Sequence, residues 1–336
     1  MRFTHATLAG MLALGMATGL ATGTTGARAE EGSLTFGLAG IPPVFVTTQQ
    51  YVAANHKFFD KYGVKVTLRP FDSGAAAARA VVAGDIDVAI SPTPLVVNMI
   101  SNAKVDLAAI YGNAHSDYLI ASVDPSITKC EQLQGMAVGV DSVGGARSIA
   151  LSQMLRPCNL KADQTQQVAL ATNVGQAMIS GQLKVGVLHI DDVPIIEEQM
   201  KKKIITIVNF GDVVKQDHYM SVIAPRKKIA ANRDAYVRLV AALIDAQKFM
   251  SDKANLDAVA ADASPTGRTL SQAKWSIEHY VPMDFWPKDS GLDKADIDAT
   301  IRAQIAVQGI RANATPVTYE QYVDESIYND AKKLVK

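Results

Sequence analysis

Hydrophobic and polar positions along the chain follow patterns that predict strands and helices in turn. The stretch VKVTLRPF (64–71) has an apolar residue at about every second position, which is typical of a strand with one buried face. The preceding stretch, 51–62, reads as a helix, and Gly63 directly after it is a C-cap signal. Strand-like and helix-like segments then alternate as far as residue 225. This order predicts an α/β fold with open sheets and helices on both faces.

The strand-like segments fall into two sets, and a helical tail follows them. The first set is predicted to contain strands at 33–39, 64–71, 87–91, 105–112 and 118–123. The second set is predicted to contain strands at 136–140, 166–170, 185–189, 204–210 and 219–225. The alanine-rich tail reads as helices at 230–261, 270–279 and 294–308.

Two similar sets joined by two strand-like segments predict two lobes with two crossings between them. We expect one lobe to hold 34–118 together with the tail 225–336, which packs on it. The other lobe would hold 123–219. The hinge strands would be 119–122 and 220–224.

One stretch in the first set has a counterpart in the second. AGDIDVAISPTPLV (83–96) and SGQLKVGVLHIDDV (180–193) share a glycine, apolar residues at matching alternate positions and a polar end. Open α/β sheets bind ligands beyond the carboxyl ends of their strands. If those ends face each other, the two polar ends meet across one cleft, and a small molecule lies between them.

The N-terminus reads as an export signal. Residues 1–29 have a short basic start, an apolar stretch and small residues ending in Ala-Arg-Ala, which is the pattern of a cleaved secretory signal peptide. No cysteine lies near the expected cleavage site, so a lipid anchor is not expected. The mature chain is therefore expected in the periplasm, an oxidising space where Cys130 and Cys158 are expected to form a disulfide.

Charge excludes one class of partner. The chain has 33 basic and 33 acidic residues, so nothing indicates nucleic acid or an anionic membrane surface. Neither cysteine has the spacing of a metal or nucleophile site, and no nucleophile elbow, phosphate loop or zinc-ligand pattern is present. No cofactor, metal or catalytic residue is expected.

Several stretches together resemble a known family. The signal peptide, GLAGIPPVFVTTQQYVAANHKFFDKYGVKVTLRPFDSG (37–74), VVAGDIDVAISPTPLV (81–96) and LQGMAVGVDSVGGARSIALSQML (133–155) carry the resemblance. It is to periplasmic solute-binding proteins of ABC importers, in the branch of alkanesulfonate, taurine and thiamine-pyrimidine-precursor binding proteins. The resemblance implies two lobes of the type II kind that close on a ligand. This chain has Lys184 at a position where members of the family commonly have Asp. The resemblance therefore does not imply that this chain binds the same ligand as the family.

The loop 141–148 is the main candidate for ligand contact. It joins a strand to a helix, and the first turn of a helix offers N–H groups and a positive dipole end to an anion. Ser142, Gly144 and Gly145 are expected at the ligand, and Arg147 could add a charged fork. In the alternative, Asp141 or Ser142 only caps the helix and Arg147 faces water.

Further candidates lie at other strand ends and at the crossings. Phe45 and Val46 leave the first strand, where Phe45 could stack on a planar ligand. Ser73 and Thr93 could each cap a helix, contact the ligand, or do both. The remaining candidates are His189 and Asp191 at the end of the repeated strand, and Tyr118 and Tyr219 at the crossings. Trp286 is a weaker candidate, because aromatic residues beside prolines often only fix a loop.

The sequence thus predicts a non-enzymatic binding protein. It would capture a small organic solute, an anion with an aromatic or heterocyclic part, and deliver it as a monomer to an ABC permease in the inner membrane. One alternative is a sensing subunit that presents its bound state to a receptor. Another is an enzyme that resembles the fungal thiamine-pyrimidine synthases, but the chain lacks their Cys-rich segment.

Overall fold

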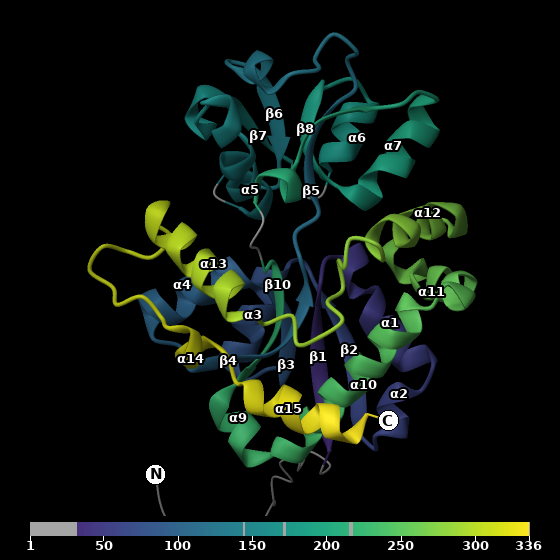
Figure 1. The fold of residues 1–336 in the computed structure, drawn as a ribbon, viewed down its shortest axis with the longest axis vertical. Coiled ribbons are helices and arrows are strands. Elements are labelled where there is room, and N and C mark those ends of the chain that lie inside the picture. The colour runs from purple at the N-terminus through teal and green to yellow at the C-terminus, as the bar shows by residue number, and fades with distance from the viewer. Residues whose placement is uncertain (1–31, 144, 171–172, 215–217, 336) are drawn as a thin grey trace, which may run out of the picture. The chain divides into compact units, whose positions relative to one another are not determined.

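The computed structural model describes residues 32–143, 145–170, 173–214 and 218–335. Within these residues, the principal strands form two five-stranded sheets. Figure 1 shows the two sheets with helices against them. The predicted α/β architecture with two lobes is confirmed. We call the first sheet and its helices lobe 1, and the second sheet with the helices between 146 and 213 lobe 2.

The sheet of lobe 1 has the order β2-β1-β3-β10-β4. Its strands are β1 (Ser33–Ala39), β2 (Lys65–Phe71), β3 (Val88–Pro92), β4 (Leu107–Ala114) and β10 (Met220–Pro225). Strands β2 and β3 pair with β1 in parallel, and β10 runs antiparallel to both β3 and β4.

The sheet of lobe 2 repeats this arrangement in the order β7-β6-β8-β5-β9. Its strands are β5 (Tyr118–Ser122), β6 (Ala137–Val140), β7 (Gln166–Ala169), β8 (Val185–His189) and β9 (Ile205–Asn209). Strands β7 and β8 pair with β6 in parallel, and β5 runs antiparallel to β8 and β9.

The repeated stretch of the sequence forms equivalent units in the two lobes. Strands β3 and β8 hold the same place in their sheets, and each follows a helix and a glycine with positive φ, Gly84 at 87° and Gly181 at 77°. The matching residues Ile86 and Leu183 are both buried. The prediction that these two segments correspond is confirmed.

The structure corrects the position of the crossings. Residues 119–122 and 220–224 were expected as hinge strands, but they are inner strands of the two sheets, β5 and β10. Each is paired on both edges and buried along nearly its whole length, because apolar residues occupy both faces. The first crossing is therefore the short segment 115–117. In the second, the chain leaves lobe 2 after residue 213 and reaches β10 at residue 220.

The helices of each lobe cover its sheet. Lobe 1 contains α1 (Thr48–Asn55), α2 (Phe58–Lys61), α3 (Gly74–Ala83), α4 (Thr93–Ala103) and α9 (Arg226–Ala231). Lobe 2 contains α5 (Ala146–Met154), α6 (Val174–Ile179), α7 (Val193–Met200) and α8 (Phe210–Val213). The tail contains α10 (Arg233–Ser251), α11 (Leu256–Asp262), α12 (Leu270–Tyr280), α13 (Lys294–Ala306), α14 (Tyr319–Tyr322) and α15 (Glu325–Leu334). No helix of the described part of the chain is long and apolar enough to cross a membrane.

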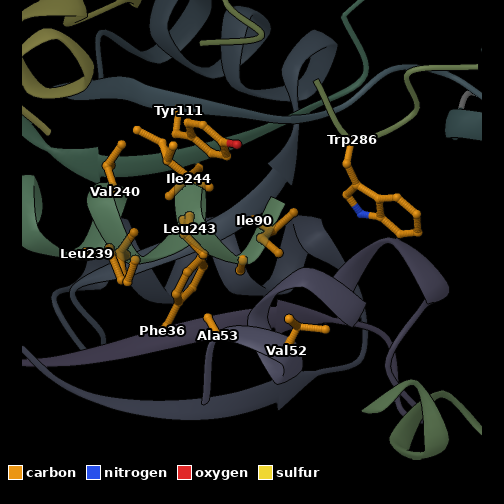
Figure 2. Packing of buried hydrophobic residues seen from close by; sticks show 14 of the residues in the cluster. Phe36, Val52, Ala53, Ile90, Tyr111, Leu239, Val240, Leu243, Ile244 and Trp286 are labelled. Atoms are coloured by element: carbon orange, nitrogen blue, oxygen red, sulfur yellow. The ribbon is translucent and has the colours of Figure 1, made fainter. Parts of the chain in front are cut away.

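The long helix α10 lies at the centre of the main core of lobe 1. Its residues Leu239, Val240 and Leu243 are fully buried and belong to one cluster with Phe36 of β1 and Val52 of α1 (Figure 2). Burying a side chain of this size stabilises the fold by about 1.5–3 kcal/mol relative to leaving it in water. The tail is thus a structural part of lobe 1, as the sequence predicts.

The two cysteines are joined. Cys130 lies in the short helix Cys130–Leu133 before β6, and Cys158 lies in Arg156–Cys158 after α5. Their Cα atoms are 6.0 Å apart in a disulfide, as expected from their places on either side of one strand and helix.

Candidate functional site

A cavity of about 870 Å³ lies between the lobes, and its walls come from both. Lobe 1 contributes the segments that follow β1, β2 and β3, including Gly40, Asp72 and Pro94. Lobe 2 contributes the segments that follow β6 and β8, including Asp141 and Asp191. The cavity is therefore at the carboxyl ends of the parallel strands of both sheets, where open α/β sheets bind their ligands.

Most residues that the sequence singles out line this cavity. They are Phe45, Val46, Ser73, Tyr118, Ser142, Gly145, Arg147, His189, Asp191 and Tyr219. Gly144 is outside the described residues. Thr93 and Trp286 are not among the residues that line the cavity.

Thr93 points into lobe 1 instead of the cavity. Its side chain is fully buried, and its hydroxyl lies 2.8 Å from Ser221 Oγ and 3.4 Å from the Tyr322 hydroxyl. It is the first residue of α4 and not its N-cap, which is Pro92. Its hydroxyl therefore joins α4 to β10 and α14, and the expectation of ligand contact is corrected at this position.

The N-terminus of α5 is capped by the protein itself. The carboxylate of Asp141 accepts hydrogen bonds from the backbone N–H groups of Ala146 at 2.9 Å and Arg147 at 3.1 Å. The sequence pattern had predicted that these N–H groups would bind an anionic ligand. The carboxylate also lies so close to Gly145 that a Cβ there would be 2.6 Å from it and 2.3 Å from Ser142 Oγ. Asp141 thus caps the helix, as one alternative had it, but Arg147 does not face water as that alternative also predicted.

Arg147 is buried and bound by protein groups. Its guanidinium donates to the carbonyl oxygen of Val187 at 2.7 Å and lies 3.3 Å from Asp192 Oδ2. Burial acts to lower the pKa of Arg147, but the Asp192 carboxylate raises it, and the net shift is upward. The side chain therefore contributes a fixed positive charge to the wall, rather than the free fork expected from the sequence.

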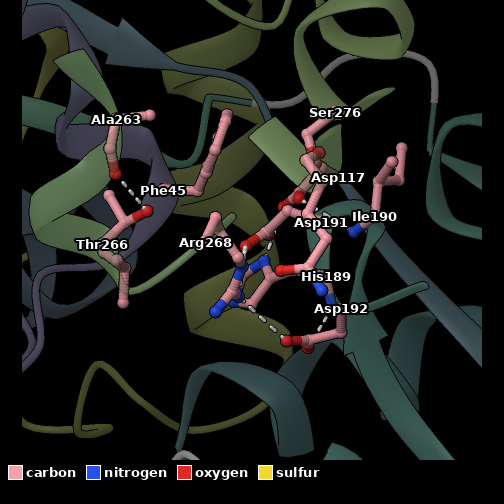
Figure 3. A network of polar contacts seen from close by, with 12 residues as sticks. Phe45, Asp117, His189, Ile190, Asp191, Asp192, Ala263, Thr266, Arg268 and Ser276 are labelled. Carbon is pink, nitrogen blue, oxygen red and sulfur yellow. Dashed lines mark hydrogen bonds and ion pairs between the residues drawn. The ribbon is translucent and has the colours of Figure 1, made fainter. Parts of the chain in front are cut away.

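A network of polar side chains around Asp191, Asp192 and Arg268 lies in the cavity wall (Figure 3). Arg268 Nε donates to Asp191 Oδ2 at 2.9 Å, and its Nη2 lies 3.3 Å from Asp192 Oδ1. The Tyr280 hydroxyl donates to Asp117 and lies 3.0 Å from Asp191 Oδ1. Burial and the neighbouring carboxylates raise the pKa of this hydroxyl well above its usual value.

Sequence reasoning missed Asp117, Arg268 and Tyr280. Asp117 precedes Tyr118 in the first crossing, so its place beside a predicted site residue was a usable signal. Arg268 and Tyr280 belong to the helical tail and meet Asp191 and Asp117 over sequence separations of 77 and 163 residues. No local pattern marks such contacts.

His189 forms the other end of this network. Its Nδ1 is 2.7 Å from Asp117 Oδ1, and its backbone N–H donates to Asp192. Burial acts to lower the pKa of His189, while the Asp117 carboxylate raises it, and the pKa ends above the ordinary 6.5. The imidazolium form is thus favoured by the buried carboxylate.

This pKa shift predicts how stability depends on pH. A histidine whose pKa is raised on folding stabilises the protein fully below its unfolded pKa, and this contribution is lost as pH rises through the folded pKa. We expect the free energy of unfolding of the wild type, relative to that of His189→Gln, to be lower at about pH 9 than at about pH 6. His218, whose pKa burial lowers to about 3, contributes the opposite slope near pH 6, because only the unfolded chain is protonated there, and this contribution is common to both proteins. Urea unfolding of both proteins at the two pH values measures this, and an equal change in both would contradict it.

Aromatic rings form much of the apolar wall. Tyr118 lies with its ring centroid 4.5 Å from that of His189 and 5.2 Å from that of Tyr219, and the two tyrosine hydroxyls are 2.5 Å apart. On the lobe 1 side, the Phe45 ring is 5.6 Å from that of Tyr280. Trp286 supports this wall from behind, because its indole N–H donates to the carbonyl oxygen of Val46. Its role is to fix the loop, which was the alternative to ligand contact.

Ser73 caps a helix, as expected, and lies in the cavity wall. Its hydroxyl accepts a hydrogen bond from the backbone N–H of Ala76 at 3.1 Å, so it caps α3. It also lines the cavity together with Gly74 and Ala75. The first turn of α3 is thus at the cavity wall.

Solved structures with the same fold come from several importers. The periplasmic nitrate-binding protein of Synechocystis PCC 6803 matches with a TM-score of 0.76 at 11% identity, covering 91% of this chain and 90% of that one. The ligand-binding component of an ABC-type import system from Staphylococcus aureus, with zinc bound, has a TM-score of 0.72 at 13% identity, covering 89% and 98%. The periplasmic aliphatic sulphonate-binding protein of Escherichia coli has a TM-score of 0.70 at 16% identity, covering 88% and 92%.

These likenesses show a common two-lobe fold at low identity. A search of curated protein sequences found no match. At the level of the sequence family, the NMT1-like family matches residues 28–264, which is more than half of the chain. The chain therefore belongs to the NMT1-like family.

Proposed function

We propose that the protein is the solute-binding component of an ABC importer. It would be exported to the periplasm, capture a small organic solute between its lobes and deliver it, as a monomer, to a permease in the inner membrane. The observation that carries this proposal is the cavity of about 870 Å³ walled by both lobes. Its volume is within the range of small-molecule sites, roughly 300–1,000 Å³. The nitrate- and sulphonate-binding proteins that share the fold support the same role.

The walls favour a solute with a planar, apolar part. Rings of Phe45, Tyr118, Phe210 and Tyr219 face the cavity, and aromatic rings prefer stacked or edge-to-face contacts with a planar partner. Because Tyr118 directly follows the first crossing and Tyr219 ends the second, a solute that contacts both rings would contact both connections. Such contacts would couple binding to the relative position of the lobes.

The cavity offers an anionic group of the solute fewer free arginines and N–H groups than the sequence predicts. Arg147 and Arg268 are paired with carboxylates, and Asp141 occupies N–H groups of α5. Of the arginines that line the described cavity, Arg156 is exposed and has no ion pair among the described residues. We therefore place a solute anion between Arg156 and the first turn of α3, if the solute is an anion as proposed.

A thermal-shift screen tests the function. The mature protein would be melted with sulfonates, aliphatic and aromatic carboxylates, pyrimidines and amino acids. A solute present at about 100 times its dissociation constant stabilises the folded state by about 2.7 kcal/mol, which raises Tm by roughly 4 °C or more. A rise with one chemical class identifies the solute class. A uniform absence of shift across aromatic and anionic compounds would contradict the proposed solute.

Substitution of Gly145 tests the place of the site. Gly145→Asp brings a Cβ to within 2.6 Å of the Asp141 carboxylate and adds a second negative charge there. We expect affinity for the solute from the screen to fall at least about tenfold, equivalent to about 1.4 kcal/mol, measured by calorimetry. Gly211→Asp is the matched control in lobe 2, because a Cβ at Gly211 meets no atom of the described residues within 4 Å. Unchanged affinity in Gly145→Asp would remove the α5 loop from the site.

A further inference from the structure

Helix α12 of the tail lies between the two lobes. Its start is fixed to lobe 1 through the end of α11, where Asp262 accepts a hydrogen bond from Asn55 at 2.7 Å and is 2.9 Å from His56 Nε2. Its buried residues Ala273 and Ile277 belong to the core cluster of lobe 1. On its other side, α12 contacts α7 and the short helix Ile190–Asp192 of lobe 2, as can be followed in Figure 1.

Several polar contacts join α12 and the residues just before it to lobe 2, beside the apolar packing of Ile190 against the lobe 1 core. Arg268, just before α12, binds Asp191 through two nitrogen atoms and reaches Asp192 with one of them. Gln272 in the first turn of α12 donates to Glu198 Oε2 of α7 at 2.7 Å. The hydroxyl of Tyr280 at the end of α12 donates to Asp117 of the first crossing, accepts from the backbone N–H of Asp191 of lobe 2 at 3.2 Å and lies 3.0 Å from Asp191 Oδ1.

Arg268 is the central contact of this set. Among the described residues, it is the cation within ion-pair distance of Asp191, whereas Asp192 also has Arg147 of its own lobe. The side chain of Arg268 is 20% exposed and that of Asp191 is 5% exposed. Ion pairs that are largely shielded from water are screened less by salt than surface pairs. If lobe 2 moved away from α12, Asp191 would lose this partner.

We propose that Arg268 is a positioning residue of an inter-lobe latch, in which it holds Asp191 and Asp192 of lobe 2 against lobe 1. The latch consists of Arg268 and Tyr280 on one side and Asp191 and Asp192 on the other. It uses only side chains of the protein, so it favours the closed arrangement independently of any solute. This goes beyond the proposed function, because it concerns the balance between open and closed lobes and not the solute.

The latch has a consequence for affinity. A solute that binds the closed arrangement has an apparent affinity proportional to the fraction of molecules already closed. Strengthening or weakening the latch therefore tunes the affinity for every solute by the same factor. It leaves the order of preference among solutes that do not touch Arg268 unchanged.

Small-angle X-ray scattering of solute-free protein tests the latch. The mature protein would be unfolded, dialysed, refolded and compared with Arg268→Gln and with Arg233→Gln. Arg233 is a matched control, because it forms an ion pair of 2.6 Å with Asp330 inside lobe 1. We expect Arg268→Gln to have a larger radius of gyration than the wild type, and Arg233→Gln to equal the wild type. An equal radius in Arg268→Gln and the wild type would overturn the proposal.

Two further variants keep the test decisive. If Arg268→Gln does not refold, as judged by far-UV circular dichroism, Asp191→Asn removes the main pair from the lobe 2 side and is expected to increase the radius, though less than the loss of Arg268, because Arg268 keeps Asp192. Arg268→Lys keeps the charge but not the fork that reaches two carboxylates, so an intermediate radius is expected. A radius in Arg268→Lys equal to that in Arg268→Gln would contradict a role for the ion pair. The test uses no solute, so its outcome is separate from that of the thermal-shift screen.

Discussion

Replacing Arg147 with methionine is expected to lower the free energy of unfolding by about 3 kcal/mol, the lower end of the range for breaking a buried ion pair. The guanidinium is 8% exposed and contacts both the Val187 carbonyl oxygen and Asp192. Without the guanidinium of Arg147, the partly buried carboxylate of Asp192 has one cation fewer beside it. The lower end applies because Arg268 still lies 3.3 Å from Asp192. Chemical unfolding followed by far-UV circular dichroism measures the change.

Arg156→Met provides the control for this prediction. Arg156 also lines the cavity but is exposed, so its replacement should change stability by no more than about 0.5 kcal/mol. The double variant Arg147→Met with Asp192→Asn removes both partners and should recover part of the loss, because no charge is then left unpaired. A loss in Arg147→Met no larger than that in Arg156→Met would show that the buried pair does not stabilise lobe 2.

Reducing the disulfide is expected to destabilise the protein by about 3.5 kcal/mol. Cys130 and Cys158 close a loop with a sequence separation of 28, and the cross-link limits the freedom of the unfolded chain. The loop contains β6 and α5, which carry Asp141 and Arg147 into the cavity wall. The loss of stability should therefore centre on lobe 2. The measurement is chemical unfolding with and without a thiol reductant.

The double variant Cys130→Ser with Cys158→Ser separates this effect from other actions of the reductant. It should resemble the reduced wild type, and its unfolding should not respond to the reductant. Both cysteines are in the disulfide, so no free thiol complicates the comparison. A wild-type unfolding midpoint that is the same with and without reductant would contradict the prediction.

The features that sequence could predict are those with a local signal. The repeated stretch was recognisable because Ile86 and Leu183 sit at matching places after glycines that need positive φ. The cysteine pair was predictable because it flanks one strand and one helix. Phe45, Ser142 and His189 were predictable as cavity residues because they lie at or beyond the carboxyl ends of parallel strands, which share one edge of a sheet.

The features that sequence reasoning missed depend on tertiary contacts. Nothing near Arg268 indicates that it will meet Asp191, because the meeting depends on how α12 lies between the lobes. The guanidinium of Arg147 was expected to be free to bind the solute, and the structure differs for a related reason. A carboxylate of the same lobe lies close enough to form an ion pair with it. The hinge strands were predicted at the wrong positions because a short apolar run has the same sequence pattern in a crossing between two sheets and in an inner strand of one sheet.

The placement of β10 has a consequence for the order in which the lobes can be completed during synthesis. Strand β10 separates β3 from β4, so the sheet of lobe 1 lacks an inner strand until residues 220–225 have been made. The strands of the lobe 2 sheet all lie between Tyr118 and Asn209 and need nothing from later in the chain. The lobe that is inserted in the middle of the sequence can thus assemble its sheet first, while the lobe that contains β1 waits for a segment made after its partner.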